Sequence, residues 1–381
     1  MFRNGCSFLK KLHSFNHHQI DRGLKVAVVG AMGRIGQPLC LLLKQSPWFD
    51  EIAILDNLNP KGLALELNHV DTKSTVTAYE GEKGHACAMK GADIVLICAG
   101  LYMEKQAVNA IDDLLTVNCR AVMEISKSAA TYCPQAFIVV CSNPVNCTLP
   151  VACEVFKKVN RFVDPCKMFG LSTLNVIRAN TLLAEVLQVA PETVDVPIIG
   201  GHSPNTVVPV LSHARPCTQL NTEEVVKITR AIQAAGDDVI RAKNGRSSAI
   251  LSAAFAAARF AVSLAKGLNG VEGVTECAMV MSNVVSDVSY FITPLQLGCC
   301  GVEKNLGVPD LTSYECCLLE TAIPFLKRDI EVGEHFIAEA IKVRRLYIGA
   351  ADRMPKLRRG RQKIEEDLSD SQDETAKPVQ C

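Results

Sequence analysis

Residues 25–36, KVAVVGAMGRIG, join an apolar run to a glycine-rich turn and then to the start of a helical pattern. Gly30, Gly33 and Gly36 have GxxGxxG spacing, in which small residues let the backbone approach a pyrophosphate and leave N–H groups free at a helix N-terminus. Alone this spacing is a weak signal, because glycines also shape ordinary tight turns. The order strand, turn and helix nevertheless predicts the first unit of a dinucleotide-binding domain.

A carboxylate follows this turn at the spacing that such a domain requires. Asp56 ends the next apolar run, EIAIL at 51–55, and can accept hydrogen bonds from both hydroxyls of an adenine ribose. It would repel a 2′-phosphate, and residues 57–59 contain no arginine to bind one. The sequence therefore predicts NAD rather than NADP as the cofactor.

Short apolar runs alternate with longer helical patterns from Leu24 onward, and they include GADIVLICAG at 91–100 and AFIVVC at 136–141. Such apolar runs predict strands that are buried on both faces, and the alternation predicts right-handed crossovers. The predicted fold class is α/β. We expect a Rossmann-type doubly wound parallel sheet in residues 23–168 and a second, mixed α+β catalytic domain in residues 169–348.

The second predicted domain has its own pattern. TECAMVMSNVV at 275–285 and SYFITPLQLG at 289–298 predict antiparallel strands. Helical periodicity predicts helices at 173–189, 222–242, 249–268 and 313–345. The segment 249–268 is apolar but rich in alanine, and it carries Arg259 in its interior, so it predicts a packed helix rather than a membrane span.

Composition excludes several classes of function. The 381 residues include 40 basic and 40 acidic side chains, a balance that favours neither nucleic acid nor a membrane surface as a partner. The length predicts about two domains. The 17 cysteines form no CxxC pair and no metal-ligand spacing, so we expect free thiols in a reducing compartment and no metal site.

The two ends of the chain differ from the rest. Residues 1–22 mix basic and large apolar residues without any acidic residue before Asp21, which predicts a targeting extension of the mitochondrial type. Lys11-Leu12 and His18 leave a glycosomal or peroxisomal signal open, and a plain disordered extension of a cytosolic protein is a third alternative. Residues 349–381 predict a disordered charged tail, whose basic half at 354–363 is able to bind an acidic partner.

Several further motifs occur together in this chain: SNPVN at 142–146, TLNVIRAN at 173–180, GGHSPNTVVPVLS at 200–212 and GVEKNLGV at 301–308. With the first turn and GADIVLICAG, they strongly resemble malate dehydrogenase of the mitochondrial type, in the lactate/malate dehydrogenase family, from about Lys25 to Ile348. The resemblance implies the family's fold, NAD and a homodimer. It also implies hydride transfer between NAD and a small 2-hydroxy or 2-oxo acid of the tricarboxylic acid cycle, in the mitochondrial matrix.

The resemblance also assigns roles to individual residues. His202 matches the histidine that exchanges the hydroxyl proton, and Arg178 matches the arginine that clamps the substrate carboxylate in bidentate geometry. Asn143 matches a residue that touches both substrate and cofactor, and Asn118 matches an asparagine of the cofactor loop. The expected cofactor contacts are Gly30, Gly33, Arg34, Ile35, Gly36, Asp56, Asn118 and Asn143.

Two parts of the implied site depart from the family pattern. Asn175 stands where the family has the aspartate that orients the histidine, and an amide cannot stabilise an imidazolium. The substrate loop, LYMEKQAVNAI at 101–111, is about two residues longer than the family's, and its only basic residue is Lys105. Met103 and Ile111 stand at the positions of the family's two substrate-binding arginines.

These departures leave three hypotheses open. The protein is an NAD-dependent dehydrogenase with an altered substrate, for which Met103 favours an apolar 2-oxo acid. Alternatively it is a catalytically silent NAD-binding paralogue with a structural, assembly or regulatory role. The third hypothesis is an ordinary malate dehydrogenase in which other groups replace those that are lost.

Overall fold

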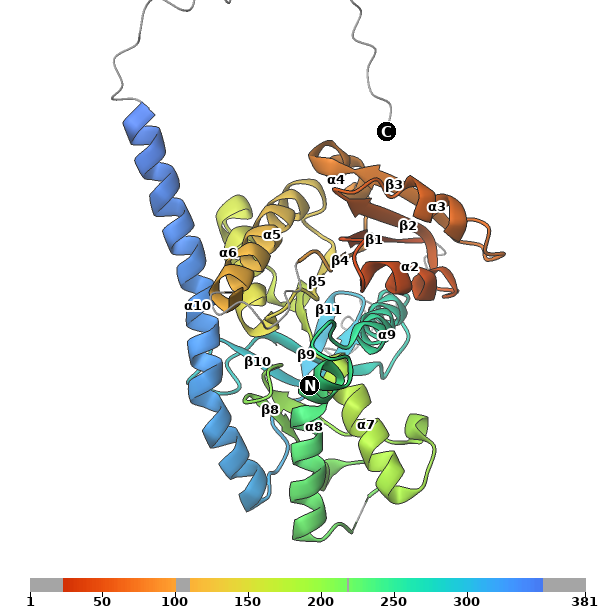
Figure 1. Ribbon diagram of the computed structural model, residues 1–381, viewed down its shortest axis with the longest axis vertical. Helices are drawn as coiled ribbons and strands as arrows, with labels where there is room; N and C mark the ends of the chain where they lie inside the picture. Colours follow the sequence, from red (N-terminus) through yellow and green to blue (C-terminus); the bar gives the residue numbers. More distant parts are fainter. Residues whose placement is uncertain (1–22, 101–109, 218, 352–381) are drawn as a thin grey trace, which may run out of the picture. The chain divides into compact units, whose positions relative to one another are not determined.

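The computed structural model describes residues 23–100, 110–217 and 219–351, without the side chains of 110–114 and 341–351 (Figure 1). The chain divides into two compact units, residues 1–334 and 335–381. In the second unit the described residues 335–351 are helical. The predictions made for residues 1–22 and for the tail beyond Ala351 lie outside the described residues.

A parallel sheet forms the first half of the fold. Its strands are β1 (Leu24–Val29), β2 (Phe49–Asp56), β3 (Thr75–Glu80), β4 (Ile94–Ile97), β5 (Phe137–Val140) and β6 (Met168–Leu171). They lie in the order β3-β2-β1-β4-β5-β6, and every neighbouring pair is parallel. This is the strand order of doubly wound dinucleotide-binding domains, in which ligands bind where the order reverses, beside β1 and β4. The predicted α/β fold class is confirmed.

The same sheet continues into the second half of the chain with antiparallel strands. These are β7 (Ile198–Gly200), β8 (Val207–Pro209), β9 (Thr275–Met281), β10 (Tyr290–Gly298) and β11 (Gly301–Asn305). β9 pairs with β6 and β10, and β10 pairs with β7 and β11. The predicted antiparallel pairing of β9 and β10 is confirmed, although β9 ends at Met281, before the end of its predicted range.

Helices connect and cover these strands. They are α2 (Gly36–Lys44), α3 (Lys61–Leu67), α4 (Gly81–Met89), α5 (Ala110–Tyr132), α6 (Val145–Asn160), α7 (Thr173–Leu187), α8 (Thr222–Ala242), α9 (Ile250–Leu268) and α10 (Ser313–Ala351). Short 3-10 helices occur at Pro165–Lys167, Pro191–Thr193 and Leu211–His213. α8 coincides with its predicted range. α7 ends two residues early because Gln188 adopts a left-handed φ of 54°, which stops the helix.

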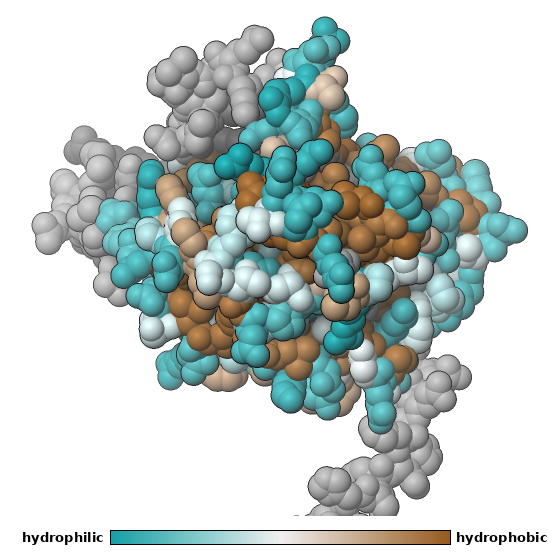
Figure 2. Space-filling model, turned by 90° about the horizontal axis from the view of Figure 1, so that it is seen from below, coloured by the Kyte–Doolittle hydropathy of each residue, from teal (hydrophilic) through white to brown (hydrophobic). Residues whose placement is uncertain are grey.

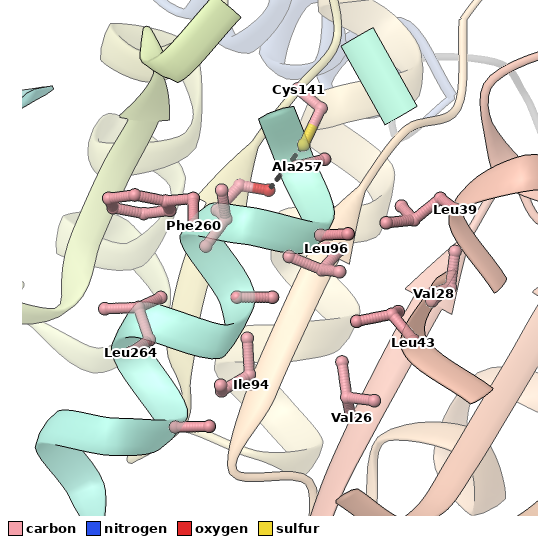
Figure 3. Packing of buried hydrophobic residues seen from close by; sticks show 14 of the residues in the cluster. Val26, Val28, Leu39, Leu43, Ile94, Leu96, Cys141, Ala257, Phe260 and Leu264 are labelled. Atoms are coloured by element: carbon pink, nitrogen blue, oxygen red, sulfur yellow. Dashed lines mark hydrogen bonds between the residues drawn. The ribbon is translucent and has the colours of Figure 1, made fainter. Parts of the chain in front are cut away.

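The two faces of the parallel sheet bury different helices. Val26 and Val28 of β1 point to one face, where they join a buried cluster with residues of α2 and α9. Figure 3 shows Phe260 and Leu264 of α9 on the face of β4 towards which the side chain of Ile94 points. In Figure 1, α5 and α6 lie side by side on the other side of β4 and β5. This packing fixes the strands whose carboxyl ends carry the candidate site.

Helix α9 is long and apolar enough to cross a membrane by length and composition alone. In this structure 56% of that window is buried, and α9 packs against α2 and α7. Burial inside the fold accounts for its apolar composition. Figure 2 shows apolar residues that also reach the surface among hydrophilic ones, as they ordinarily do in folded proteins.

The core around Phe260 generates the first testable prediction. Phe260 is fully buried, and its ring packs edge-on against Phe169 with 5.5 Å between centroids. Phe260→Ala should lower the free energy of unfolding by about 3–5 kcal/mol, through lost burial and the cavity that remains. Denaturant titration measures this loss, with Phe162→Ala as the control because that side chain is 67% exposed. Equal effects of the two substitutions would contradict the packing described here.

Candidate functional site

The glycine-rich turn follows β1 and is built by close backbone contacts. Gly30 has a φ of +91°, and a Cβ there would lie 2.5 Å from the backbone N of Ala99. A Cβ on Gly36 would lie 2.3 Å from the carbonyl O of Gly30, whereas one on Gly33 would be 3.1 Å from the same oxygen. Gly30 and Gly36 are therefore required by sterics, which places the start of α2 directly against the turn.

The N-terminus of α2 is open to an anion. Ile35, the residue before the helix, makes no side-chain cap, and the first turn of α2 contains no acidic residue. Helix N–H groups without a cap, together with the positive end of the helix dipole, favour a pyrophosphate. Arg34 is exposed beside this turn and donates a 3.1 Å hydrogen bond to the carbonyl O of Arg246.

Asp56 connects the second strand to this turn. Its Oδ2 accepts a 2.9 Å hydrogen bond from the backbone N–H of Met32, and its Oδ1 accepts a 3.0 Å hydrogen bond from that of Leu58. Each carboxylate oxygen has two lone pairs, so both can still accept from ribose hydroxyls. The observed cradle of two sterically required glycines and a carboxylate therefore fits NAD.

Asn118 of α5 contacts Asn143, which lies three residues after β5. Nδ2 of Asn118 donates a 2.8 Å hydrogen bond to the carbonyl O of Asn143. Asn118 is buried, and its Oδ1 would lie 2.8 Å from a Cβ on Gly100, three residues after β4, so a larger residue there would displace the Asn118 side chain. The structure thus brings the predicted cofactor-loop asparagine to the carboxyl ends of β4 and β5, beside the glycine-rich turn.

His202 lies just after β7, and a buried amide that sequence reasoning missed holds its backbone. Oδ1 of Asn146 accepts a 2.8 Å hydrogen bond from the backbone N–H of His202. Nδ2 of Asn146 donates to Oγ1 of Thr206 at 3.1 Å and to Oδ2 of Asp329 at 2.9 Å. Asn146 is only 1% exposed, so this network is shielded from water and fixes His202 firmly.

The side chain of Asn175 contacts the ring of His202, as the sequence predicts. Nδ2 of Asn175 lies 3.3 Å from Nδ1 of His202 and 3.4 Å from the carbonyl O of the same residue. In this orientation the amide donates towards two acceptors, whereas a flipped amide would set its oxygen against a carbonyl oxygen. The neutral ring then carries its proton on Nε2.

Arg178 lies one turn further along α7, on the same face as Asn175. Among the described residues its guanidinium makes no ion pair or hydrogen bond, and burial lowers its pKa. A partly buried, unpaired guanidinium suits a carboxylate ligand. Gly236 of α8 lies beside it, because a Cβ there would be in van der Waals contact, at 3.7 Å, with both terminal nitrogens.

The environment of His202 disfavours its charged form. Burial first, and then the charge of Arg178, lower the pKa of His202 from 6.5 to about 4. The ring is therefore neutral at pH 7, and it gains a proton only as the pH falls towards 4. No carboxylate faces His202 to oppose this shift among the described residues.

The remaining site predictions concern the substrate loop and metals. Met103 lies outside the described residues, and Ile111 lies in the first turn of α5, where side chains are not described. Within the described part of the chain, no group of three histidine, cysteine or acidic side chains is placed to hold a metal ion.

Comparison with known proteins places this geometry in context. Residues 24–170 match the model of the lactate/malate dehydrogenase NAD binding domain, and residues 172–337 match that of the lactate/malate dehydrogenase alpha/beta C-terminal domain. The chain is 43% identical to the mitochondrial malate dehydrogenases of Pongo abelii and Homo sapiens over 313 residues. This alignment covers 82% of the chain and 91% of each relative.

Solved structures share the fold at lower sequence identity. Malate dehydrogenase of Cryptosporidium parvum superposes with a TM-score of 0.71 at 22% identity, covering 82% of this chain and all of that one. Lactate dehydrogenase of the same organism, complexed with lactic acid and NAD, gives 0.70 at 23% identity over 82% of this chain and 98% of that one. These likenesses support the fold described above.

Asp56 generates a prediction about the cofactor. Asp56→Ala should weaken NAD by about 1.5–3 kcal/mol, or about 10- to 150-fold in Kd, because charge-assisted hydrogen bonds to the ribose are lost. The Kd of Asp56→Asn for NAD should lie between those of the unaltered protein and Asp56→Ala, because the amide oxygen can still accept from the backbone N–H of Met32. Calorimetry measures the affinities, with Asp71→Ala as the exposed-carboxylate control. An unaltered protein that binds neither NAD nor NADH would refute the assignment.

Proposed function

This chain belongs to the lactate/malate dehydrogenase family, and we propose that it is a divergent member that binds NAD and a small 2-oxo or 2-hydroxy acid. The family and the NAD cofactor predicted from sequence are confirmed, and residues 24–170 are the NAD-binding domain. We further propose that turnover of oxaloacetate and malate is severely impaired. The contact of the Asn175 amide with the ring of His202 carries this proposal.

The predicted division of the chain distributes the site between two segments. Residues 23–168 supply the cofactor cradle of Gly30, Gly36 and Asp56. Residues 169–348 supply Arg178 and His202, which are the substrate side of the site. NAD, when bound, supplies the hydride chemistry at C2 of the substrate.

Arg178 and His202 retain the family's substrate-binding chemistry. The unpaired guanidinium of Arg178 can bind a carboxylate through two parallel N–H donors, which fixes the substrate's orientation. Nε2 of His202 is the atom that would exchange a proton with the substrate oxygen. Asn146 holds the backbone of His202, whereas the ring itself contacts Asn175.

The proton exchange itself is compromised. To reduce an oxo group the ring must begin as imidazolium, yet with a pKa of about 4 it is protonated in only about one molecule in 10³ at pH 7. To oxidise a hydroxyl, Nε2 must offer a lone pair, but donation from Asn175 to Nδ1 leaves the proton on Nε2. The comparable change of aspartate to asparagine in a serine-protease triad lowers kcat about 10⁴-fold.

The sequence of the substrate loop supports a second candidate. Without the two arginines, residues 101–111 lack the groups that read a distal carboxylate and polarise the substrate oxygen. Met103 favours an apolar 2-oxo acid over a dicarboxylate. A catalytically silent role, in which NAD binding serves structure, assembly or regulation, is the outcome if no 2-oxo acid is reduced.

We also propose that the protein acts in the mitochondrial matrix. Two observations support this location: the basic and apolar composition of residues 1–22, and the names of relatives that are mitochondrial malate dehydrogenases. Confocal imaging of the full chain with a C-terminal fluorescent tag distinguishes the matrix from the glycosome, the peroxisome and the cytosol.

Position 175 generates the central prediction. Asn175→Asp should raise the pKa of His202, because a carboxylate stabilises the imidazolium, and should raise kcat for oxaloacetate reduction by about 10²-fold. NMR titration of the ring and steady-state kinetics measure the two effects. Asn180→Asp is the matched control, since it places a buried carboxylate on the same helix where Oδ1 of Asn180 accepts from Val196.

The optimum for reduction should move with the pKa. In the unaltered protein, any rate that depends on imidazolium should increase as the pH falls from 7 towards 4, whereas in Asn175→Asp that increase should be complete at higher pH. An unaltered protein that reduces oxaloacetate with a kcat of about 10² s⁻¹ at pH 7 would sink the proposal.

The homodimer remains a proposal, and α9 offers a test of it. Most of α9 is buried within the chain, but Leu251 is 72% exposed and Phe255 is 51% exposed, and they lie four residues apart on one face. Replacing both residues with glutamate should weaken a dimer that uses this face, and light scattering at micromolar concentration measures the mass. Phe162→Glu is the control, and a monomeric unaltered protein would rule the dimer out.

A further inference from the structure

Two cysteines form the whole connection between β10 and β11. Gly298 at the end of β10 pairs with Gly301 at the start of β11, so Cys299 and Cys300 are the two residues of the hairpin turn. Both thiols are exposed, and their Sγ atoms lie 3.8 Å apart. The turn therefore holds the two adjacent thiols close to each other at the surface.

The backbone around this turn is fixed by a glycine. Gly301 has a φ of +99°, and a Cβ there would lie 2.0 Å from the carbonyl O of Cys166. A turn followed by a glycine with positive φ is a common hairpin connection, and it lets both cysteines keep a negative φ. The turn is therefore seated against the segment that carries Cys166, and its geometry is defined.

A cavity of about 320 Å³ gives small molecules access to the pair. Cys299, Cys300 and Lys167 are among the residues that line it. Nζ of Lys167 hydrogen-bonds Oε1 of Gln135 and lies 3.8 Å from Oδ2 of Asp164, so these groups already occupy its charge. The hydrogen bond to Cys300 and burial raise the pKa of Cys299. Cys166 is also near: burial first, then the charge of Asp164 and that of Cys300, raise the pKa of Cys166.

We propose that Cys299 and Cys300 are a redox-active vicinal dithiol, which a small-molecule disulfide of the glutathione class oxidises to an intramolecular disulfide. The thiols must close from 3.8 Å to about 2.05 Å, which requires rotation of the two side chains and adjustment of the backbone within the turn. This modification site is independent of the cofactor and substrate groups described above.

The reaction balances in two steps. The Cys300 thiolate attacks one sulfur of the disulfide RSSR, so a Cys300–SR bond forms, the RS–SR bond breaks and RS⁻ leaves. Cys299 loses its proton to solvent and attacks the Cys300 sulfur, so the Cys299–Cys300 bond forms and the second RS⁻ leaves. The two cysteines lose two electrons and two protons, and RSSR is reduced to two RSH.

The disulfide should be readily reversible. Adjacent residues joined by a trans peptide have Cα atoms about 3.8 Å apart, less than the 4.4–6.8 Å that most disulfides span. Such strain, together with surface exposure, gives a disulfide an oxidising potential, so a monothiol reductant removes it. Reversibility distinguishes this pair from a stable structural bridge.

The chain contains a matched control for this geometry. Cys316 and Cys317 are also adjacent and exposed, but they lie on α10, where successive side chains point in different directions around the helix. Sequence adjacency is the same in both pairs, and only the backbone differs. The hairpin pair should therefore oxidise to a disulfide while the helical pair should not.

Mass spectrometry of the full chain tests the proposal. Oxidised glutathione is added, free thiols are alkylated, and the protein is digested under non-reducing conditions. We expect the peptide that holds Cys299 and Cys300 to lose two hydrogens and escape alkylation, with recovery after reduced glutathione. The Cys316–Cys317 peptide should remain alkylated twice or carry glutathione. Cys300→Ser should prevent closure, whereas Cys317→Ser should leave it unchanged.

Other products would overturn the proposal. These are a hairpin that stops at glutathione addition, a disulfide from Cys166 to Cys299 or Cys300, an intermolecular disulfide, and equal closure of the helical pair. Cys166→Ser separates the second case, because it would abolish the product only if Cys166 were a partner. Thermal unfolding of each variant, measured in reductant, verifies that a loss of closure reflects the thiol and not misfolding.

Discussion

The buried amide of Asn146 is the contact on which the candidate site depends most. It accepts from the backbone of His202 and donates to Thr206 and Asp329, so one side chain joins α6, the segment after β7 and α10. Because Asn146 is only 1% exposed, water does not compete for its hydrogen bonds. The backbone of His202 is therefore held by a group that is separate from the Asn175 side chain in contact with its ring.

This separation is consistent with the proposal that the site keeps its architecture while its chemistry differs from that of the family. In family members an aspartate at this position would orient the ring and also stabilise its charge. Here Asn175 still contacts the ring, but burial and Arg178 act on the imidazolium, and no carboxylate among the described side chains opposes them. Arg178 lowers the pKa of His202. Under the proposed function the same guanidinium also binds the substrate carboxylate. Because Asn175 is neutral, it does not offset the effect of the Arg178 charge on the pKa of His202.

Sequence reasoning reached the fold, and it named residues that the structure brings together, because the features it used are local. Apolar runs and glycine spacing predict strands and turns within a few residues of one another, as at Gly30 and Asp56. The contact of Asn146 with Asp329 spans 183 residues, and nothing in the local pattern signals it. The orientation of the Asn175 amide was also beyond the sequence, because it depends on the carbonyl of His202, which folding brings beside it. The start of α9 at Ile250 rather than Ala249 reflects the ordinary imprecision of helix ends.

The two adjacent cysteine pairs have the same sequence but different backbone conformations. Both read as Cys-Cys in the sequence, where an abundance of cysteine indicates only free thiols. The hairpin between β10 and β11 turns one pair so that its sulfurs face each other, whereas a helix disperses the other pair. Reactivity at Cys299 and Cys300 is thus a property of the turn that Gly301 makes possible, just as the behaviour of His202 is a property of the residues that surround its ring. In both places the chemistry of a side chain depends on which groups the fold brings beside it.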